Sequence, residues 1–223
     1  MTGGERYSRQ VLVWGEENQR MLERSAILIA GVGGLGATVA QLMARAGVGM
    51  LYLADHGVVD WPDLNRQLLY DEGDVGQKKV TAAARKIMAI NGAVQAIPLD
   101  VRIDGAFTPP AGINCVADCL DSFSGRFALF NSLADGTILI HGAIQGDHGQ
   151  VLTLVKGVSR PIDEIFAGSR QPAGPIPVTP AGPAVIAGYM AHELTRAIRG
   201  RPGLADRVLV VDLTDYSCSF LDV

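Results

Sequence analysis

Short apolar segments recur along the chain and alternate with amphipathic segments of helical length. The clearest apolar segment covers 27–30 (Ile-Leu-Ile-Ala) and is followed by glycine, and comparable segments cover 50–54, 113–119 and 137–141. A short, β-branched run of this kind is typical of a strand that is buried on both faces, as in a parallel sheet. We therefore expect these segments to form the parallel core of the protein.

Amphipathic segments between the apolar runs predict helices. In 76–91, for example, Val80, Ala84 and Ile87 recur at helical spacing. Further helices are expected at 16–24, 35–45, 127–133 and 184–198. Strands that alternate with helices indicate a Rossmann-like α/β fold, with a mostly parallel central sheet and helices on both faces. Folds of this class bind ligands at the carboxyl ends of their strands.

The pattern changes toward the C-terminus. Weak alternation predicts an edge strand at 94–99 and a further strand at 150–155, and 208–212 with 218–223 predicts an antiparallel C-terminal extension. The segment 156–183 holds six of the 11 prolines, and we expect a long functional loop there. We expect a single domain over 1–223, made of an N-terminal arm and helix (1–25), a core (26–155), this loop, and a C-terminal helix and hairpin (184–223).

Three glycines follow the first strand at the spacing G-x-G-x-x-G, at Gly31, Gly33 and Gly36. The first allows a tight turn, the second lets the backbone approach a phosphate, and the third lets helix and strand pack closely. The next helix also points its free N–H groups and positive dipole end toward an anion. With a strand before it and a helix after it, the motif predicts a nucleotide-phosphate site. The alternative is an ordinary strand-to-helix turn that merely needs glycine.

Acidic residues follow two further predicted strands. Asp55 lies 19 residues beyond Gly36, where a Rossmann unit places the acid that binds ribose hydroxyls, although a strand-end aspartate can also cap the next turn. Asp118 and Asp121 follow the segment that begins at 113. Because the carboxyl ends of parallel strands share one edge of a sheet, we expect these acids to lie near the glycine turn.

Lys78 and Lys79 stand at the start of the predicted helix 76–91. Cations at a helix N-terminus oppose the helix dipole, so the pair suggests an external anion, although solvated surface lysines are the commoner explanation.

Composition and charge restrict the partners and the compartment. The 223-residue chain has a formal net charge of −4 and no basic cluster, so nucleic acid is not expected as a partner. It has neither the ~18-residue apolar run of a membrane span nor an apolar leader, and we expect no membrane association and a cytoplasmic location. The three cysteines and four histidines lack the spacing of metal ligands, so no zinc site is expected.

Taken together, these residues resemble the ThiF/MoeB/HesA family, the bacterial relatives of ubiquitin-activating enzymes, over nearly the whole chain. In the first half of the chain, Arg6-Tyr-Ser-Arg9-Gln10 resembles the family motif R-Y-x-R-Q, Gly31 to Gly36 resembles G-x-G-G-L-G, and Ala46-Gly47-Val48-Gly49 resembles A-G-V-G. Further along, Leu64-Asn65-Arg66-Gln67 resembles L-x-R-Q, and Gly76-Gln-Lys-Lys79 resembles G-x-x-K. Asp118 to Asp121 resembles D-x-x-D, and Gly142-Ala143 with Gly149-Gln150 resembles G-A…G-Q. One such motif is weak evidence, whereas the series in this order is highly specific.

The resemblance implies adenylation, with ATP and Mg, of the C-terminal carboxylate of a small ubiquitin-like sulfur-carrier protein of the ThiS/MoaD type that ends in Gly-Gly. It also implies a homodimer, in which Arg9 reaches the triphosphate of the partner protomer. By this resemblance, the glycine turn (Gly31, Gly33, Gly34 and Gly36) binds the nucleotide, and Asp55 binds the ribose. Arg66 and Lys79, beside Asn65, bind the phosphates, and Asp121 binds Mg.

The chain departs from the family pattern in three ways. Asp63 replaces the asparagine of S-N-L-x-R-Q, and a carboxylate facing the triphosphate repels phosphate unless Mg lies between them, which suggests a second metal contact. The two Cys-x-x-Cys pairs that hold zinc in many members are absent. No cysteine lies in 156–183, where some members form a carrier-linked thioester or persulfide. We therefore expect the reaction to stop at the adenylate.

Other functions are compatible with parts of this pattern. An NAD(P)-dependent oxidoreductase explains the glycines and Asp55 but leaves Arg66, Lys79 and Asp121 without a purpose. A degenerate member that binds a carrier or a nucleotide without catalysis is a second alternative, and Asp63 supports it. The acceptor could also be the carboxylate of a small molecule or a peptide, because no feature of the sequence identifies the groove that binds the acceptor.

Overall fold

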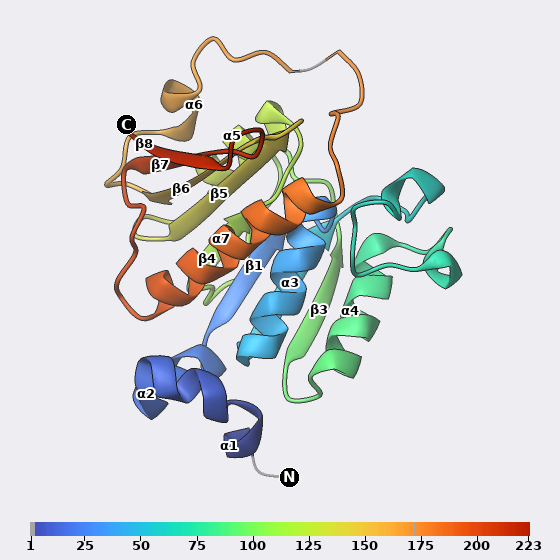
Figure 1. Cartoon of the computed structure of the whole chain (residues 1–223), viewed down its shortest axis with the longest axis vertical. Coiled ribbons are helices and arrows are strands. Elements are labelled where there is room, and N and C mark those ends of the chain that lie inside the picture. Colours follow the sequence, from blue (N-terminus) through green and yellow to red (C-terminus); the bar gives the residue numbers. More distant parts are fainter. Residues whose placement is uncertain (1–2, 172) are drawn as a thin grey trace.

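An eight-stranded sheet runs through the protein in the order β3-β2-β1-β4-β5-β6-β7-β8 (Figure 1). The computed structural model describes residues 3–171 and 173–223. The strands β3 (Gln95–Asp100), β2 (Met50–Asp55), β1 (Ala26–Ala30), β4 (Cys115–Asp118) and β5 (Ile138–Gln145) are parallel. The strand order reverses between β1 and β4, as in a Rossmann fold. The predicted fold class is therefore confirmed, with 94–99 as an edge strand.

The last strands form the antiparallel extension. Strands β6 (His148–Val155), β7 (Arg207–Asp212) and β8 (Ser217–Asp222) each pair antiparallel with the strand before them. The hairpin of β7 and β8 confirms the expectation for 208–223, and β8 is exposed along its whole length.

Helices cover both faces of the sheet. The helices α3 (Gly34–Ala46), α4 (Lys79–Ile90) and α7 (Ala181–Ile198) pack on one face, and α5 (Phe123–Ser132) and the short α6 (Ile162–Ile165) pack on the other (Figure 1). Successive residues of β1 serve the two layers, because Ile27 and Ile29 belong to the first core and Leu28 belongs to the second. Burial on both faces explains why the strands are continuous apolar runs.

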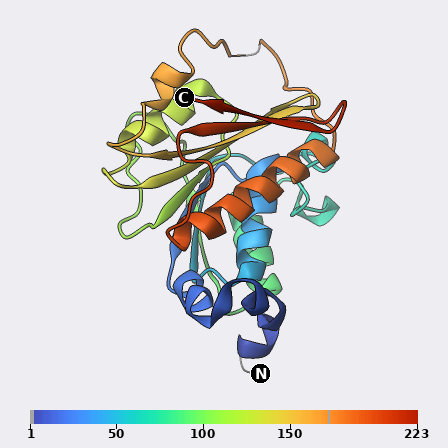
Figure 2. The ribbon, with the colours of Figure 1, turned by 60° about the vertical axis from the view of Figure 1, so that its left-hand side comes forward.

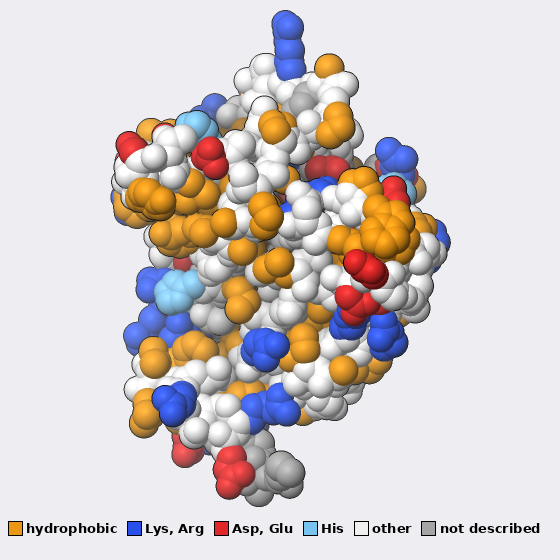
Figure 3. Space-filling model, turned by 45° about the vertical axis from the view of Figure 1, so that its right-hand side comes forward, with side chains coloured by type: hydrophobic (Ala, Val, Ile, Leu, Met, Phe, Trp, Pro, Cys, Tyr) orange, Lys and Arg blue, Asp and Glu red, His pale blue; other side chains and the backbone are white. Residues whose placement is uncertain are grey.

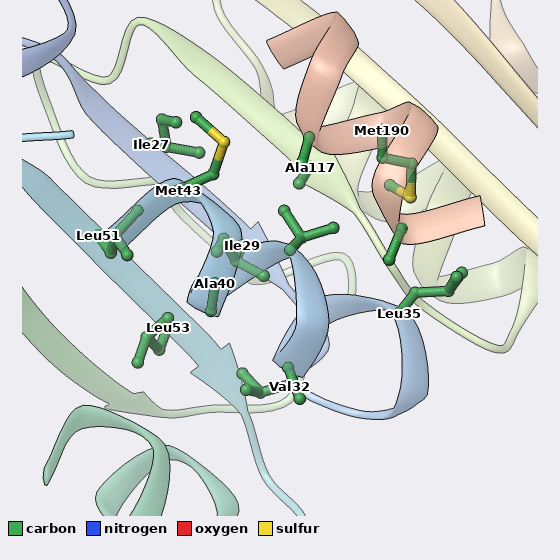
Figure 4. Packing of buried hydrophobic residues seen from close by; sticks show 14 of the residues in the cluster. Ile27, Ile29, Val32, Leu35, Ala40, Met43, Leu51, Leu53, Ala117 and Met190 are labelled. Atoms are coloured by element: carbon green, nitrogen blue, oxygen red, sulfur yellow. The ribbon is translucent and has the colours of Figure 1, made fainter. Parts of the chain in front are cut away.

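In the larger core, α3 packs against the sheet and lies beside α7, which also packs on the sheet. Figure 4 shows Ala40 and Met43 of α3 packed among Ile27 and Leu51 of the sheet, with Met190 of α7 nearby. All five side chains are completely buried. This packing fixes α3, and therefore its N-terminus, relative to the carboxyl ends of the strands.

The N-terminal arm packs at the opposite end of α3. It contains α1 (Gly3–Arg6) and α2 (Ser8–Glu23), and α2 consists of two helical parts joined at Gly15, where the backbone is not helical and φ is 81°. The part after Gly15 confirms the predicted helix at 16–24, and the part before it was not predicted. Tyr7 is buried, and its ring lies against Gly47, just beyond the C-terminus of α3. Figure 2 shows this arm far from the long loop at the other end of the molecule.

Local capping explains the other differences from the predicted boundaries. The polar connection after β2 contains two short 3₁₀ helices, η1 (Trp61–Asp63) and η2 (Glu72–Asp74), and each is closed by a reciprocal pair of aspartates. α5 begins at Phe123 rather than at 127, because the Ser122 side chain accepts a hydrogen bond from the Gly125 amide. The segment 156–183 is largely irregular, apart from α6 and the start of α7.

Two further observations concern membranes and metals. Within 3–171 and 173–223, the longest apolar helix still falls short of what a bilayer crossing requires. In the same ranges, no three His, Cys, Asp or Glu side chains gather into a metal-binding group.

A close backbone contact joins β1 to α3. A Cβ atom on residue 36 would lie only 1.9 Å from the carbonyl oxygen of Gly31, and one on residue 31 would lie 2.8 Å from the carbonyl oxygen of Cys119. Gly31 also has a φ of 84°, which favours glycine. The glycine turn therefore cannot accept a side chain at either position without moving.

A buried charged cluster lies beneath the carboxyl ends of β4 and β5. The Asp118 carboxylate receives a hydrogen bond from His141 Nδ1 at 2.8 Å and lies 3.6 Å from Arg126 Nη1. Burial alone would raise the pKa of Asp118, but the Arg126 charge and the His141 hydrogen bond outweigh it and lower this pKa. Burial and the Arg126 charge lower the pKa of His141 against the opposing effect of Asp118. His141 is therefore neutral, with its proton on Nδ1, since a carboxylate can only accept.

The same cluster holds the loop after β4. Arg126 Nη2 donates to the Leu120 carbonyl, and Arg126 Nη1 donates to the Gly142 carbonyl at 3.2 Å. Leu120 directly precedes Asp121, so the buried guanidinium positions the backbone on which Asp121 stands.

We expect Gly36→Ala to lower the free energy of unfolding by about 3 kcal/mol, because the new methyl group collides with the Gly31 carbonyl. The matched control is Gly188→Ala in α7, where a Cβ meets nothing within 4 Å. This control should raise stability by about 0.5–1 kcal/mol through helix propensity. Urea denaturation of both variants checks the contact, and equal stabilities would contradict it.

The charged cluster predicts that acid destabilises the fold. The pKa of His141 is lower in the folded protein than the ordinary value of 6.5, so the unfolded chain takes up a proton first as the pH falls. The contribution of neutral His141 to the free energy of unfolding is fully present above about pH 6.5, and below that pH it decreases by up to about 1.4 kcal/mol per pH unit. Protonation of Asp118 lowers the free energy of unfolding further at lower pH. Denaturation between pH 7.5 and 5.5 should show a steeper loss for the wild type than for His141→Asn. Parallel pH profiles would contradict the neutral assignment.

Candidate functional site

A cleft of about 680 Å³ opens at the carboxyl ends of β1, β2 and β4, where the strand order reverses. This is the position at which open α/β sheets bind ligands, and the volume suits a ligand the size of a nucleotide. The residues predicted from the sequence that line it are Gly31, Gly33, Gly34, Asp55, Arg66, Lys79 and Asp121. Asp118 does not line it, because that carboxylate is buried in the charged cluster.

The glycine turn forms one wall of the cleft. Gly33 is the N-cap of α3, and no side chain caps that helix, so its first N–H groups face the cleft together with the positive end of the dipole. The Tyr70 hydroxyl donates to the Val32 carbonyl at 2.8 Å and holds the turn from behind. Burial raises the pKa of Tyr70, so this hydroxyl keeps its proton. The turn is therefore held in place with its free amides toward the cleft, an arrangement that suits an anion.

Asp55 links the turn to the end of β2. Its Oδ2 accepts from the Val32 amide at 2.8 Å, and its Oδ1 accepts from the Gly57 amide at 2.7 Å. Each carboxylate oxygen has a second lone pair, so the side chain can still accept from a ribose hydroxyl. The structure thus gives Asp55 a structural contact in addition to the predicted place in the cleft.

Two cations also line the cleft, and one carboxylate lies between them. Lys79 is the first residue of α4, and Arg66 follows η1. Lys79 Nζ lies 3.1 Å from Asp63 Oδ2, and Arg66 Nη2 lies 3.5 Å from Asp63 Oδ1. The cleft therefore combines helix-dipole and side-chain positive charge with one anchored negative charge.

Gln67 contributes a buried amide to the cleft. It is 2% exposed, and its Nε2 donates to Asp63 Oδ1 at 2.5 Å. Among residues 3–171 and 173–223, Gln67 Oε1 has no hydrogen-bond partner. A buried acceptor without a partner is costly. Gln67 therefore adds a polar side chain to the cleft lining, with one acceptor atom left unpaired in the described part of the chain.

Asp121 also lines the cleft, at a point that the loop 156–183 reaches. Its side chain is exposed, and its backbone carbonyl accepts from Gln171 Nε2 at 3.0 Å. Gln171 also accepts from the Phe123 amide at 3.1 Å, and Pro175 and Ile176 of the same loop line the cleft. Part of the proline-rich segment therefore lines the cleft, and its function stays a prediction.

Lys78 lies outside the cleft lining and pairs with Asp100. Three of the residues to which the resemblance assigned roles also lie outside it. Gly36 is buried against Gly31, and Asn65 is exposed and accepts from Arg66 Nη1 at 3.1 Å. Arg9 is exposed on α2, at the far end of α3, and α3 is about 20 Å long. That distance exceeds the reach of an arginine side chain, so Arg9 could contact such a cleft only in a second copy of the chain.

Some residues of the site were not given a role from the sequence. Gln67 was recognised only as part of a motif, and nothing indicated that Arg126 would lie at the floor of the cleft. The signal for Gln67 was its place beside Arg66 in the polar connection. Arg126 precedes an apolar helix in the sequence, where a basic residue is most simply a surface residue.

Apolar side chains are exposed around the segment that carries Arg66. Trp61 is 60% exposed and Leu68 is 53% exposed. The space-filling view shows hydrophobic side chains next to acidic and basic ones on the surface of the molecule (Figure 3).

The cysteines are not activated. Burial raises the pKa of Cys115 to about 12, and burial together with the Asp118 charge raises the pKa of Cys119, which lines the cleft. Both thiols therefore stay protonated at neutral pH, and a thiol is a poor nucleophile. Cys218 is exposed on β8.

The chain matches a family model and several known proteins. The model of the ThiF family matches residues 7–223. The chain is 37% identical over 157 residues to the SAMP-activating enzyme E1 of Haloferax volcanii, an alignment that covers 68% of this chain and 58% of that protein. It is 32% identical over 237 aligned positions to the sulfur carrier protein adenylyltransferase of Thermus thermophilus, an alignment that covers 98% of this chain and 87% of that protein.

A solved structure shows the same fold. The structure of Escherichia coli MccB with ATP superimposes with a TM-score of 0.81 at 19% identity, over 97% of this chain and 71% of that one. The chain thus spans little more than half of the Haloferax relative but most of the Thermus one. The family match extends from the N-terminal arm to the last residue, and on this ground the chain belongs to the ThiF family.

Proposed function

We propose that the chain catalyses the ATP-dependent adenylation of the C-terminal carboxylate of a small ubiquitin-like sulfur-carrier protein that ends in Gly-Gly. Pyrophosphate is the second product. The observation that carries this proposal is the convergence of the glycine turn, Arg66, Lys79 and Asp121 on one cleft at the reversal point of the sheet. The names of the Haloferax and Thermus relatives support the substrate class.

The donors in the cleft fit a magnesium nucleotide. Backbone amides and two cations suit a polyphosphate, and Asp55 suits a ribose. Magnesium is typically held by one or two carboxylates together with waters and phosphate oxygens, so a group of three acidic ligands is not required. Asp121 would provide such a carboxylate. When bound, Mg²⁺ would neutralise charge on the phosphate oxygens.

In the proposed reaction, a carboxylate oxygen of the carrier attacks the α-phosphorus of ATP. The bond from that phosphorus to the bridging oxygen breaks, and pyrophosphate leaves with the electron pair. Lys79 and Arg66 offset the charge that accumulates on the leaving group, and the amides of the glycine turn hold the phosphates in line. No general base is needed, because a C-terminal carboxylate is ionised at pH 7.

The residues outside the cleft complete the proposal. Residues 1–223 form one adenylation domain. Two copies of the chain form a homodimer, in which Arg9 of one protomer reaches the triphosphate of the other. The reaction ends at the acyl-adenylate, because no cysteine lies in 156–183 and burial keeps the Cys119 thiol beside the cleft protonated. Free cysteines are typical of a reducing compartment, which supports a cytoplasmic location. Trp61 and Leu68 offer apolar surface to a protein partner.

We expect the chain to exchange labelled pyrophosphate into ATP only when a sulfur carrier with an intact Gly-Gly end is present. The control is the same carrier without its terminal glycines, which removes the reacting carboxylate from the cleft. Tight ATP binding without exchange would instead indicate a non-catalytic member. Turnover of a nicotinamide cofactor would indicate an oxidoreductase, and exchange with a peptide or a small acid would change the acceptor.

Asp121→Ala should reduce magnesium-dependent exchange by at least about 100-fold, the typical cost of losing a charged contact to the transition state. The residue is exposed, so the denaturation midpoint should stay that of the wild type. Asp163→Ala, which removes an exposed aspartate on α6, serves as the matched control and should leave exchange unchanged. Normal turnover of Asp121→Ala at several Mg²⁺ concentrations would exclude the proposed metal role.

A further inference from the structure

Asp63 has an unusual set of contacts for a residue in a phosphate cleft. Its Oδ1 accepts from Gln67 Nε2 and pairs with Arg66, and its Oδ2 accepts from the Asp60 amide at 3.1 Å and pairs with Lys79. The side chains of Asp63 and Lys79 are each only 14% exposed. One carboxylate therefore contacts both of the cations that the proposed function assigns to the phosphates, and Arg66 also donates to the Pro62 carbonyl at 2.7 Å.

Two of these contacts fix Asp63 independently of the cations. The Asp60 amide belongs to the reciprocal cap of η1, and the Gln67 amide is buried. Lys79 and Arg66, in contrast, carry long side chains that can turn toward another anion. When a polyphosphate enters the cleft, the carboxylate thus stays in place, and its negative charge remains beside the phosphates.

We propose that Asp63 is a fixed counter-anion that makes polyphosphate binding depend on a divalent metal. This inference rests on the proposed function, because it concerns the same cations. The carboxylate competes with phosphate for Lys79 and Arg66 and repels a metal-free polyphosphate. A bound divalent cation cancels part of the ligand's charge and weakens that repulsion in proportion. Asp63 thereby selects the metal complex over the free anion, a role different from that of a metal ligand.

The test is calorimetric titration of the full chain with pyrophosphate, in EDTA and in excess Mg²⁺. Asp63→Asn keeps the size and shape of the side chain but removes the charge, and it should tighten metal-free binding by about tenfold. The preference for the magnesium complex should shrink by the same factor. The matched control is Asp60→Asn, which makes the same charge change in the same cap of η1, outside the cleft lining, and should change neither affinity.

Two results would overturn the inference. If Asp63→Asn leaves metal-free binding unchanged and loses only the magnesium-dependent part, Asp63 is a metal ligand. If both metal-free and magnesium-bound affinities fall, Asp63 merely supports the cleft. Arg66→Gln separates this failure from failure of the proposed function. If Arg66→Gln binds pyrophosphate as well as the wild type, the cleft is not the phosphate site at all.

A structural measurement decides the matter if Asp63→Asn does not fold. In a crystal of the wild-type chain with pyrophosphate, we expect Lys79 Nζ to contact phosphate while Asp63 keeps its bonds to Gln67 and the Asp60 amide. Pyrophosphate bound in the cleft with the Lys79–Asp63 pair intact would contradict the competition.

Discussion

The contact between Gly36 and the Gly31 carbonyl is the constraint on which the site depends. Because no side chain separates β1 from α3 at this point, the helix begins directly at the carboxyl edge of the sheet. The apolar side chains of α3 are then packed against the sheet and beside α7, which prevents the helix from tilting away. The free amides of its first turn are consequently held at one place, where a phosphate can use them without further reorganisation.

Two aspartates at the carboxyl edge illustrate opposite uses of one carboxylate. Asp118 is fully buried with Arg126 and a neutral His141, and it stabilises the loop that carries Asp121. Asp63 is partly exposed and pairs with cations whose side chains can move. Burial keeps Asp118 and Arg126 paired, since separating them would leave one charge unpaired in the protein interior. Access to solvent makes the second exchangeable, so that a ligand can compete for the cations.

The sequence was sufficient for the fold because its signals were local. The apolar run 27–30 and the glycines after it fixed β1 and the start of α3, and alternation of strands and helices gave the parallel sheet. Boundaries failed where a side chain decided them, as at Ser122, whose cap starts α5 earlier than hydrophobic periodicity indicated. The helix predicted at 16–24 was found, but the helical part of α2 before Gly15 was missed, because it is separated from the rest by a non-helical glycine.

The candidate site was predictable only in part. Residues at strand ends and in the glycine turn could be placed because the sheet dictates their position, as for Asp55 and Gly33. The pairing of Asp63 with Lys79 depends on how the polar connection folds back over α4, and the role of Arg126 depends on contacts between α5 and the ends of two strands. Contacts of this kind arise from tertiary packing, so no spacing in the sequence could report them.

The most direct test of the account is a crystal structure of the chain with Mg²⁺ and a non-hydrolysable ATP analogue. We predict that the phosphates lie against the first amides of α3, with Lys79 and Arg66 on one side and the metal next to Asp121. A triphosphate bound elsewhere, away from the glycine turn and both cations, would contradict the claim that this cleft is an adenylation site.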